Sequence, residues 1–352
     1  MVLERAWGDL FAIKLAHELV SSLRLSSSTT LLAIPDFKQI SESIKSQAIV
    51  PKAGEVISNP KGSARGLKFV KRDTIIFVMP GVPIELKHMF VQSILPTIIK
   101  KIENPILSRT LRTTGIAESV LYDFIETRSK NNKNKIGYYP SVYGVDIKVS
   151  NKNQEEINLF IDMMYEMFGN EIYGENDTSM ERVVVESCIK NRKKIAVAES
   201  CTGGLIGDRI SNISGCSEIF IGGLIVYSNN SKVKILDLDN EGLDEFGAVS
   251  KYTARKMAEN VKTMFNSSFG LSVTGIAGPN GGTKDKPVGL VYIGLASDKN
   301  TIVEKYNFGK DRGLNKIKTS QAALQILRKG LLDEWKIKTH IFMLSCAYGS
   351  KI

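Results

Sequence analysis

The second half of the chain alternates short apolar segments with amphipathic ones, and this alternation constrains the fold more than any other feature. A short buried strand is predicted at 194–198, and further strands are predicted at 220–227, 271–273, 288–296 and 301–308. Helices are predicted at 180–190, 203–213, 252–265 and 314–332. Ser250 is a good N-cap for the third of these helices. This order of elements predicts a three-layer α/β/α sandwich.

The first half of the chain shows a different pattern. A helix is predicted at 3–23, a buried strand at 74–79 and a second helix at 84–101. Beyond them, we expect a strand at 107–114, a helix at 117–127, a strand hairpin at 138–150 and a helix at 155–168. The polar segment 170–178 is a plausible domain boundary. We therefore expect domains at 1–104, 105–174 and 175–335, then a tail at 336–352 that forms a last strand or frays.

Composition and charge exclude several classes of protein. No apolar run is long enough to cross a bilayer, and the N-terminus lacks a signal-peptide pattern, so a cytoplasmic protein without a membrane partner is expected. The four cysteines and three histidines form no metal-binding or Ser-His-Asp pattern. The net charge of +10 is spread along the whole chain. Scattered lysine is typical of a solvated surface, so nucleic acid is not an expected partner.

Three turns of the predicted sandwich carry small polar residues and glycines directly after apolar strands, where open α/β sheets bind ligands. In the first turn, Ser200 and Thr202 supply hydroxyls. The neighbouring Gly203 and Gly204 would expose backbone N–H groups at the start of a helix, which suits an anion or an oxyanion. Taken alone, this segment is also compatible with an ordinary polar turn.

The second turn contains Tyr227 and Lys232, and the third runs from Thr274 to Thr283. A serine hydroxyl is a poor nucleophile unless a base takes its proton. Since no histidine is nearby, a desolvated Lys232 is the candidate base, and Tyr227 could relay or orient the proton. Taken alone, both would more often be ordinary loop residues. The third turn is rich in glycines, which form an N–H nest for a phosphate.

These motifs closely resemble the CinA C-terminal domain family, the nicotinamide mononucleotide deamidases. The resemblance covers 178–332 and includes Ala198-Glu-Ser-Cys-Thr-Gly-Gly204, Tyr227-Ser-Asn229 with Lys232, Gly247-Ala-Val-Ser250 and Val273-Thr-Gly-Ile-Ala-Gly-Pro279. It implies hydrolysis of the carboxamide of nicotinamide mononucleotide to nicotinate mononucleotide and ammonia. It also implies a Ser-Lys mechanism without a metal or cofactor, in which Ser200 attacks, Lys232 is the base and Tyr227 assists. Family members are typically homodimers.

The resemblance also implies a set of substrate-binding residues: Glu199, Thr202, Gly203, Gly204, Asn229, Thr274, Gly275, Ala277, Gly278 and Arg312. The family usually carries a second arginine one helical turn after the position of Arg312. Here Lys316 or Lys318 occupies that region. Lysine keeps the charge but lacks the bidentate fork of arginine.

The N-terminal half resembles the rest of the CinA family in part. Pro80-Gly-Val-Pro83 with Glu85 is similar to the second half of a molybdopterin-binding-like domain, and Thr113 to Ser119 is similar to the small middle domain. The opening strand of that first domain and its Thr-Gly-Gly-Leu-Gly-Pro stretch are absent. In the family this domain is associated with metal-dependent hydrolysis of ADP-ribose. We expect that activity to be lost, with a divalent metal involved only if it survives.

Two alternatives remain open from the sequence. Cys201 is a candidate nucleophile in place of Ser200, although it lacks a nearby histidine to form the thiolate. The chain is alternatively a non-catalytic nucleotide-binding or competence-associated protein. The trio Ser200, Tyr227 and Lys232 argues against that alternative, because binding alone does not need it.

Overall fold

The computed structural model describes residues 29–31, 49–51, 54–100, 102, 104–128 and 133–348. The predicted helix at 3–23 lies outside these residues. The chain divides into two compact units, Met1–Pro105 and Ile106–Ile352. Among the described residues, no helix combines the length and the apolar character that a membrane span requires.

The first unit contains a small antiparallel sheet of three strands, β3 (Glu55–Ile57), β4 (Gly66–Lys71) and β5 (Thr74–Val78). A separate pair is formed by β1 (Thr29–Leu31) and β2 (Ile49–Pro51). The predicted strand at 74–79 is confirmed as β5, but the prediction that it is buried was wrong: four of its residues are half-buried and Thr74 is exposed. The reason is that, among the described residues, β5 is an edge strand that pairs with β4 alone.

The helical segment that follows β5 changes its winding once. It comprises α4 (Pro83–Met89), the π-helical turn η2 (Phe90–Ile94) and α5 (Leu95–Ile99). Pro96 lies just beyond the π turn and has no backbone N–H for the hydrogen-bond ladder. The predicted helix at 84–101 is therefore confirmed as a helical segment that includes one wider turn.

The second unit begins with a βαββαβ fold of four strands and two helices. Its elements are β6 (Leu107–Thr113), α6 (Glu118–Arg128), β7 (Lys135–Ser141), β8 (Gly144–Asn151), α7 (Gln154–Phe168) and β9 (Ile172–Glu175). The strands pair antiparallel in the order β7-β8-β6-β9. The polar segment at 170–178 was predicted as a boundary only, and β9 corrects this, because its residues Ile172 and Tyr173 are buried.

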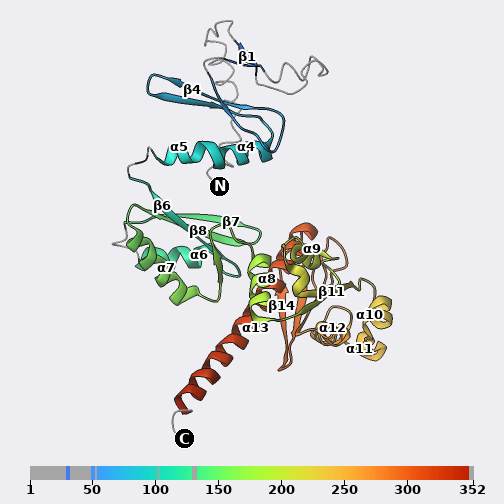
Figure 1. The fold of residues 1–352 in the computed structure, drawn as a ribbon. Helices are drawn as coiled ribbons and strands as arrows, with labels where there is room; N and C mark the ends of the chain where they lie inside the picture. Colours follow the sequence, from blue (N-terminus) through green and yellow to red (C-terminus); the bar gives the residue numbers. More distant parts are fainter. Residues whose placement is uncertain are drawn as a thin grey trace. The chain divides into compact units, whose positions relative to one another are not determined.

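The rest of the second unit is built on a five-stranded sheet in the order β11-β10-β12-β13-β14. Figure 1 labels its two outer strands, β11 and β14. The strands are β10 (Ile195–Glu199), β11 (Phe220–Ile225), β12 (Phe269–Gly275), β13 (Leu290–Ala296) and β14 (Thr301–Asn307). β10 pairs parallel with β11 and β12, whereas β13 and β14 are antiparallel additions. All five predicted strands are present.

Helices cover both faces of this sheet. They are α8 (Met180–Asn191), α9 (Leu205–Ser211), α10 (Asn229–Leu236), α11 (Asn240–Phe246), α12 (Lys251–Met264) and α13 (Arg312–Tyr348). Alternate residues of β10 separate two cores: Ile195 and Val197 pack with α8, α9 and α13, while Ala196 and Ala198 pack with α10, α11 and α12. This arrangement confirms the predicted three-layer sandwich.

Three details of the helices refine the sequence predictions. Ser250 is the N-cap of α12, where its hydroxyl accepts a hydrogen bond from the N–H of Thr253, as predicted. The helices α10 and α11 were not predicted; the first begins inside the segment interpreted as a loop. The alternative of a last strand in the predicted tail at 336–352 was wrong, because α13 continues as a helix to Tyr348; residues 349–352 lie outside the described residues.

Candidate active site

The carboxyl end of β10 is the point where the order of the parallel strands reverses. The chain leaves β10 for β11 on one side and later returns to β12 on the other, and Glu199 is in register with Ile225 and with Val273. The turn after β10 therefore lies between the turns after β11 and β12. In open α/β sheets such a switch point is where ligands bind. Ser200 is the first residue after β10 at this point.

The side chain of Lys232 reaches Ser200 from α10. The distance from Lys232 Nζ to Ser200 Oγ is 3.2 Å, and Nζ also donates to the backbone oxygens of Val226 at 2.9 Å and Tyr227 at 3.2 Å. Only 1% of the Lys232 surface is exposed, and 7% of the Ser200 surface. Among the described residues, no carboxylate lies within salt-bridge distance of this ammonium group.

Burial lowers the pKa of Lys232 below its ordinary value of 10.5, because the charged form is poorly solvated there. The three contacts also suit a neutral amine. Its two N–H groups would donate to the carbonyl oxygens of Val226 and Tyr227, and its lone pair would accept the hydroxyl proton of Ser200. The arrangement of a nucleophile with an adjacent base is therefore present without a histidine.

A short helix places Lys232 at this depth. α10 begins with a reciprocal cap in which Ser228 Oγ accepts from the N–H of Ser231, and Ser231 Oγ accepts from the N–H of Ser228. Lys232 follows in the first turn and points back to the end of β10. The Ser-Asn-Asn-Ser pattern is the local signal for this helix start, and the sequence analysis missed it.

The resemblance implies that Glu199 binds the substrate, but in the structure its side chain is bonded to the backbone of the following turn and helix. Its carboxylate is buried, with 1% exposed, and accepts from the N–H groups of Gly204 at 3.0 Å, Ile206 at 3.1 Å and Gly207 at 2.8 Å. It therefore caps the start of α9, next to Ser200, and its negative charge is favourable at the positive end of the helix. The geometry makes Glu199 a residue that positions the turn.

The two glycines of the first turn do not offer the free N–H groups predicted from the sequence. Gly203 N–H donates to the backbone oxygen of Ser200, and Gly204 N–H is used by Glu199. Both glycines have positive φ, +62° and +96°, so the tight turn itself explains them. A Cβ on Gly203 would lie 3.9 Å from Lys316 Nζ, which places this ammonium group beside the turn.

Arg312 connects the second and third turns. It donates from Nη2 to the hydroxyl of Tyr227 at 2.8 Å and from Nη1 to the backbone oxygen of Gly278 at 3.0 Å. The hydroxyl of Tyr227 thus contacts Arg312, whereas its backbone oxygen contacts Lys232. Arg312 and Tyr227 are exposed, so this end of the site is open to solvent.

The other predicted binding residues divide into three groups. Thr202 Oγ1 is buried and has no hydrogen-bond partner among the described residues. Thr274 donates to the backbone oxygen of Ala248 at 2.6 Å, and Gly275 packs so tightly that a Cβ would lie 2.7 Å from the oxygen of Leu290. Asn229 is exposed in the first turn of α10. In this structure Thr274 and Gly275 therefore build the carboxyl end of β12, the central strand of the sheet.

Asn315 is a residue of the site that the sequence analysis missed. Its buried Nδ2 donates to the backbone oxygens of Ala277 at 2.9 Å and Gly309 at 3.0 Å. It thereby attaches the third turn, including the positive-φ Gly278, to α13. No local pattern marks this asparagine, because its partners are far away in the sequence.

Cys201 lies next to Ser200 but in a different environment. Its side chain belongs to the apolar core between the sheet and α8, α9 and α13, and burial raises its pKa to about 12. A thiolate is the nucleophilic form of cysteine, so this thiol is poorly suited to attack. Within the described residues, no group of three histidine, cysteine or acidic side chains is arranged to hold a metal ion.

Comparisons with known proteins agree with the architecture of the second unit. The model of the CinA C-terminal domain matches residues 177–331, and that of the damage-inducible protein CinA KH domain matches 108–174. A "Putative competence-damage inducible protein" of Clostridium botulinum is 38% identical over 301 residues, covering 84% of this chain and 74% of that protein. Its namesake in Caldicellulosiruptor bescii is 40% identical over 296 residues, covering 82% and 72%.

A solved structure of the competence/damage inducible protein CihA from Agrobacterium tumefaciens is 34% identical to this chain. It covers 43% of this chain and 93% of its own, with a TM-score of 0.42. The two matched domain models together span more than half of the sequence, and the relatives are similar over most of it. The chain therefore belongs to the CinA family of competence/damage-inducible proteins.

Proposed function

We propose that this chain is an amidohydrolase that converts nicotinamide mononucleotide to nicotinate mononucleotide and ammonia. The observation that carries the proposal is the buried Lys232 Nζ at 3.2 Å from Ser200 Oγ, with two backbone oxygens as its other neighbours. A lysine that is buried without a carboxylate destabilises the fold unless it is neutral, so its presence beside a serine supports a catalytic role.

The chemistry proceeds in two steps. Ser200 Oγ attacks the carboxamide carbon while Lys232 takes the hydroxyl proton, and Lys232 then returns that proton to the leaving nitrogen, which departs as ammonia. A water molecule next gives a proton to Lys232 and attacks the resulting ester. The ester breaks, the carboxylate forms, and Ser200 regains the proton from Lys232. One water is consumed, and the proton that the new carboxylic acid loses leaves with the ammonia as ammonium.

Two cations support a phosphorylated substrate. Arg312 and Lys316 lie one helical turn apart at the start of α13, and Lys316 Nζ is beside Gly203. Arg312 is oriented by Tyr227 and Gly278. Together they place positive charge at the open end of the site, where a phosphate group of the substrate would be held. Lys318, the other candidate, faces a separate cavity on the same helix.

Ammonia release from nicotinamide mononucleotide tests the proposal. We expect activity in the unmodified chain and a loss of at least about 10³-fold in Ser200→Ala and Lys232→Met, since both partners of the proton transfer are needed. Lys234→Met is the matched control, because Lys234 is exposed on the same helix. Cys201→Ala is expected to retain activity, and its inactivity together with an active Ser200→Ala would transfer the nucleophile to Cys201.

The non-catalytic alternative gives a different result in the same experiment. A nucleotide-binding protein without turnover would bind nicotinamide mononucleotide in a titration, yet none of the variants would differ in ammonia release from the unmodified chain. An inactive unmodified chain that binds the nucleotide would therefore replace the amidohydrolase proposal with the binding one.

We also propose that the chain forms a homodimer. The sheet edge at β11 has no neighbouring strand among the described residues, and Ile221 and Ile225 on it are 39% and 58% exposed. Unpaired strand edges with apolar side chains favour association. Light scattering after size-exclusion chromatography tests this, and a monomer at micromolar concentration would contradict it.

A further inference from the structure

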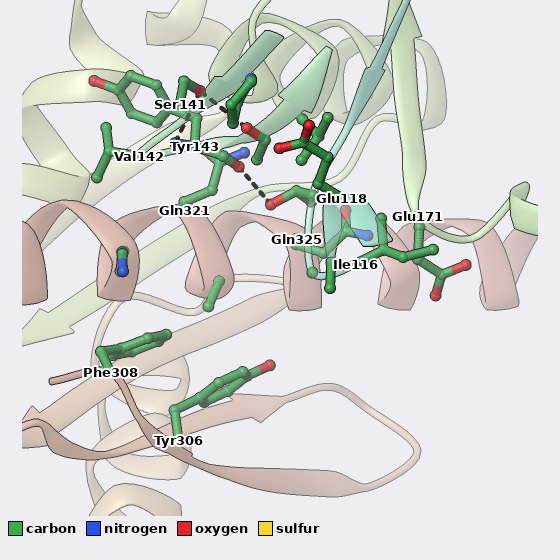
Figure 2. A pocket seen from close by; sticks show the side chains of 18 of the residues that line it. Ile116, Glu118, Ser141, Val142, Tyr143, Glu171, Tyr306, Phe308, Gln321 and Gln325 are labelled. Atoms are coloured by element: carbon green, nitrogen blue, oxygen red, sulfur yellow. Dashed lines mark hydrogen bonds between the residues drawn. The ribbon is translucent and has the colours of Figure 1, made fainter. Parts of the chain in front are cut away.

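A second cavity in the unit Ile106–Ile352 lies away from Ser200 and Lys232. It has a volume of about 470 Å³, within the usual range for small-molecule sites. The loop at 141–144 and the start of α6 form one wall, and α13 forms another. Tyr306 of β14 and Phe308, which follows directly after this strand, complete the lining (Figure 2). None of these residues belongs to the candidate active site.

One buried polar atom in the wall of this cavity has no hydrogen-bond partner among the described residues. Gln321 is only 3% exposed, and its Nε2 is buried without a hydrogen bond among the described residues. Its Oε1 accepts from Arg209 Nη2 at 2.8 Å, and Arg209 also forms an ion pair with Glu181 at 2.7 Å. Because a guanidinium group can only donate, the amide oxygen must face Arg209. The amide nitrogen is therefore left as an unsatisfied donor.

Three other polar side chains of the wall already have partners. Thr114 donates to the backbone oxygen of Tyr143 at 2.8 Å, and Ser141 donates to that of Gly144 at 3.2 Å. Gln325 donates to the backbone oxygen of Asn170 at 2.7 Å. The unsatisfied donor of Gln321 is thus a specific feature, and a buried donor without an acceptor costs free energy that a ligand oxygen would recover.

The lining carries two ammonium groups and two carboxylates, so positive charge without a paired carboxylate is found only locally, at Lys318. Lys329 is 3.7 Å from Glu171, so these two are paired. Lys318 lines the cavity three residues before Gln321, on the same face of α13, and among the described residues it has no carboxylate within salt-bridge distance. Glu118 also lines the cavity and supplies one negative charge. An ammonium group and an amide N–H on neighbouring turns would hold the oxygens of one anionic group.

The aromatic side chains supply the second half of a binding site. The rings of Tyr306 and Phe308 are stacked, with centroids 5.2 Å apart and planes at 11° to each other. Figure 2 shows them across α13 from the loop that carries Tyr143, so the cavity has an aromatic side and a polar side. A ligand that fits both sides of the cavity would carry a flat ring for the aromatic side and, separated from it, an anionic group for the polar side.

We propose that this cavity binds a mononucleotide, with its ring against Tyr306 and Phe308 and its phosphate at Gln321 Nε2 and Lys318. The site is separate from the candidate active site, and the proposal does not depend on the amidohydrolase reaction. It concerns binding alone, so its failure and a failure of the proposed function would be recognised in different measurements.

Isothermal titration of the full chain with AMP tests this, with adenosine and inorganic phosphate as partial probes. We expect AMP to bind more tightly than either. Gln321→Glu keeps the oxygen that faces Arg209 but replaces the donor with a negative oxygen, so AMP binding should weaken about tenfold or more. Gln154→Glu makes the same change of charge on an exposed residue of α7 and should not alter binding.

Three further variants make the outcome decisive. Lys318→Gln should also weaken AMP binding, and it serves as the test if Gln321→Glu does not fold. Lys316→Ala shows whether AMP binds at the candidate active site instead, because Lys316 lies beside Gly203. Lys234→Met, at an exposed position of α10, is the control and should leave the affinity unchanged. The proposal is overturned if AMP does not bind at millimolar concentration, if Gln321→Glu and Lys318→Gln bind it as the unmodified chain does, or if only Lys316→Ala reduces binding.

Discussion

The cap that Glu199 provides for α9 gives the most direct test of how this structure supports its candidate site. The change Glu199→Gln keeps the shape of the side chain but replaces one carboxylate oxygen with an amide nitrogen. One oxygen of Glu199 accepts from Gly204 and Ile206, and the other accepts from Gly207. The amide oxygen of glutamine would keep the first pair, and its nitrogen would face the N–H of Gly207, donor against donor.

The expected loss of stability follows from these contacts. One buried N–H loses its acceptor, which costs about 1–3 kcal/mol, and the remaining two bonds lose their charge assistance. We therefore expect the free energy of unfolding of the second unit to fall by about 2–4 kcal/mol. For a unit of this size, each kcal/mol lowers the melting temperature by about 2–4 °C, so a decrease of roughly 5–15 °C is expected.

Calorimetry of the full chain measures the shift, and hydrogen exchange locates it. The amides of Gly204, Ile206 and Gly207 should exchange faster in Glu199→Gln, because they would open with α9. Glu245→Gln is the control, since Glu245 is exposed on α11 and surface changes usually stay within about 0.5 kcal/mol. A melting temperature lowered by less than about 2 °C, with unchanged exchange in α9, would refute the capping role.

The remaining predictions concern the base, the cations and Tyr227. Because burial lowers the pKa of Lys232 and the base must be neutral, kcat/KM should rise with pH to a plateau with its midpoint below 10.5; a flat profile would exclude Lys232 as the base. The unfolded chain binds this proton more tightly, so stability should also rise with pH between the lowered pKa and 10.5, and Lys232→Met should remove that slope. Lys316→Ala should raise the KM for nicotinamide mononucleotide about tenfold, whereas Lys318→Ala should leave this KM unchanged. Equal effects of the two changes would contradict the proposal that Lys316 is the second phosphate-binding cation beside Arg312. Tyr227→Phe removes the 2.8 Å hydrogen bond to Arg312 and should raise KM about two- to tenfold with kcat preserved, whereas a kcat loss above about tenfold would show that the hydroxyl relays a proton.

The sequence alone was sufficient to predict those helices, strands and caps that depend on local patterns of residues. Apolar segments of strand length between amphipathic helices predicted the α/β/α sandwich, and Ser250 was recognised as an N-cap from its position before α12. Ser200 and Lys232 were selected because strand ends with small polar residues are where such sheets bind ligands. Strand pairing later placed their side chains within 3.2 Å, although they are 32 residues apart.

Only the tertiary structure decided the roles of residues whose partners are distant in the sequence or hidden in a turn. From the sequence, Glu199 was predicted to be a polar residue of a binding turn, but its carboxylate accepts hydrogen bonds at the start of α9. Arg312 reaches Tyr227 across 85 residues. The rotation of α13 about its axis places Lys316 beside Gly203 and Lys318 in the wall of the cavity that Gln321 also lines. The physical reason is that residue type and spacing determine which local structure forms, whereas the direction of each side chain depends on which elements pack against it.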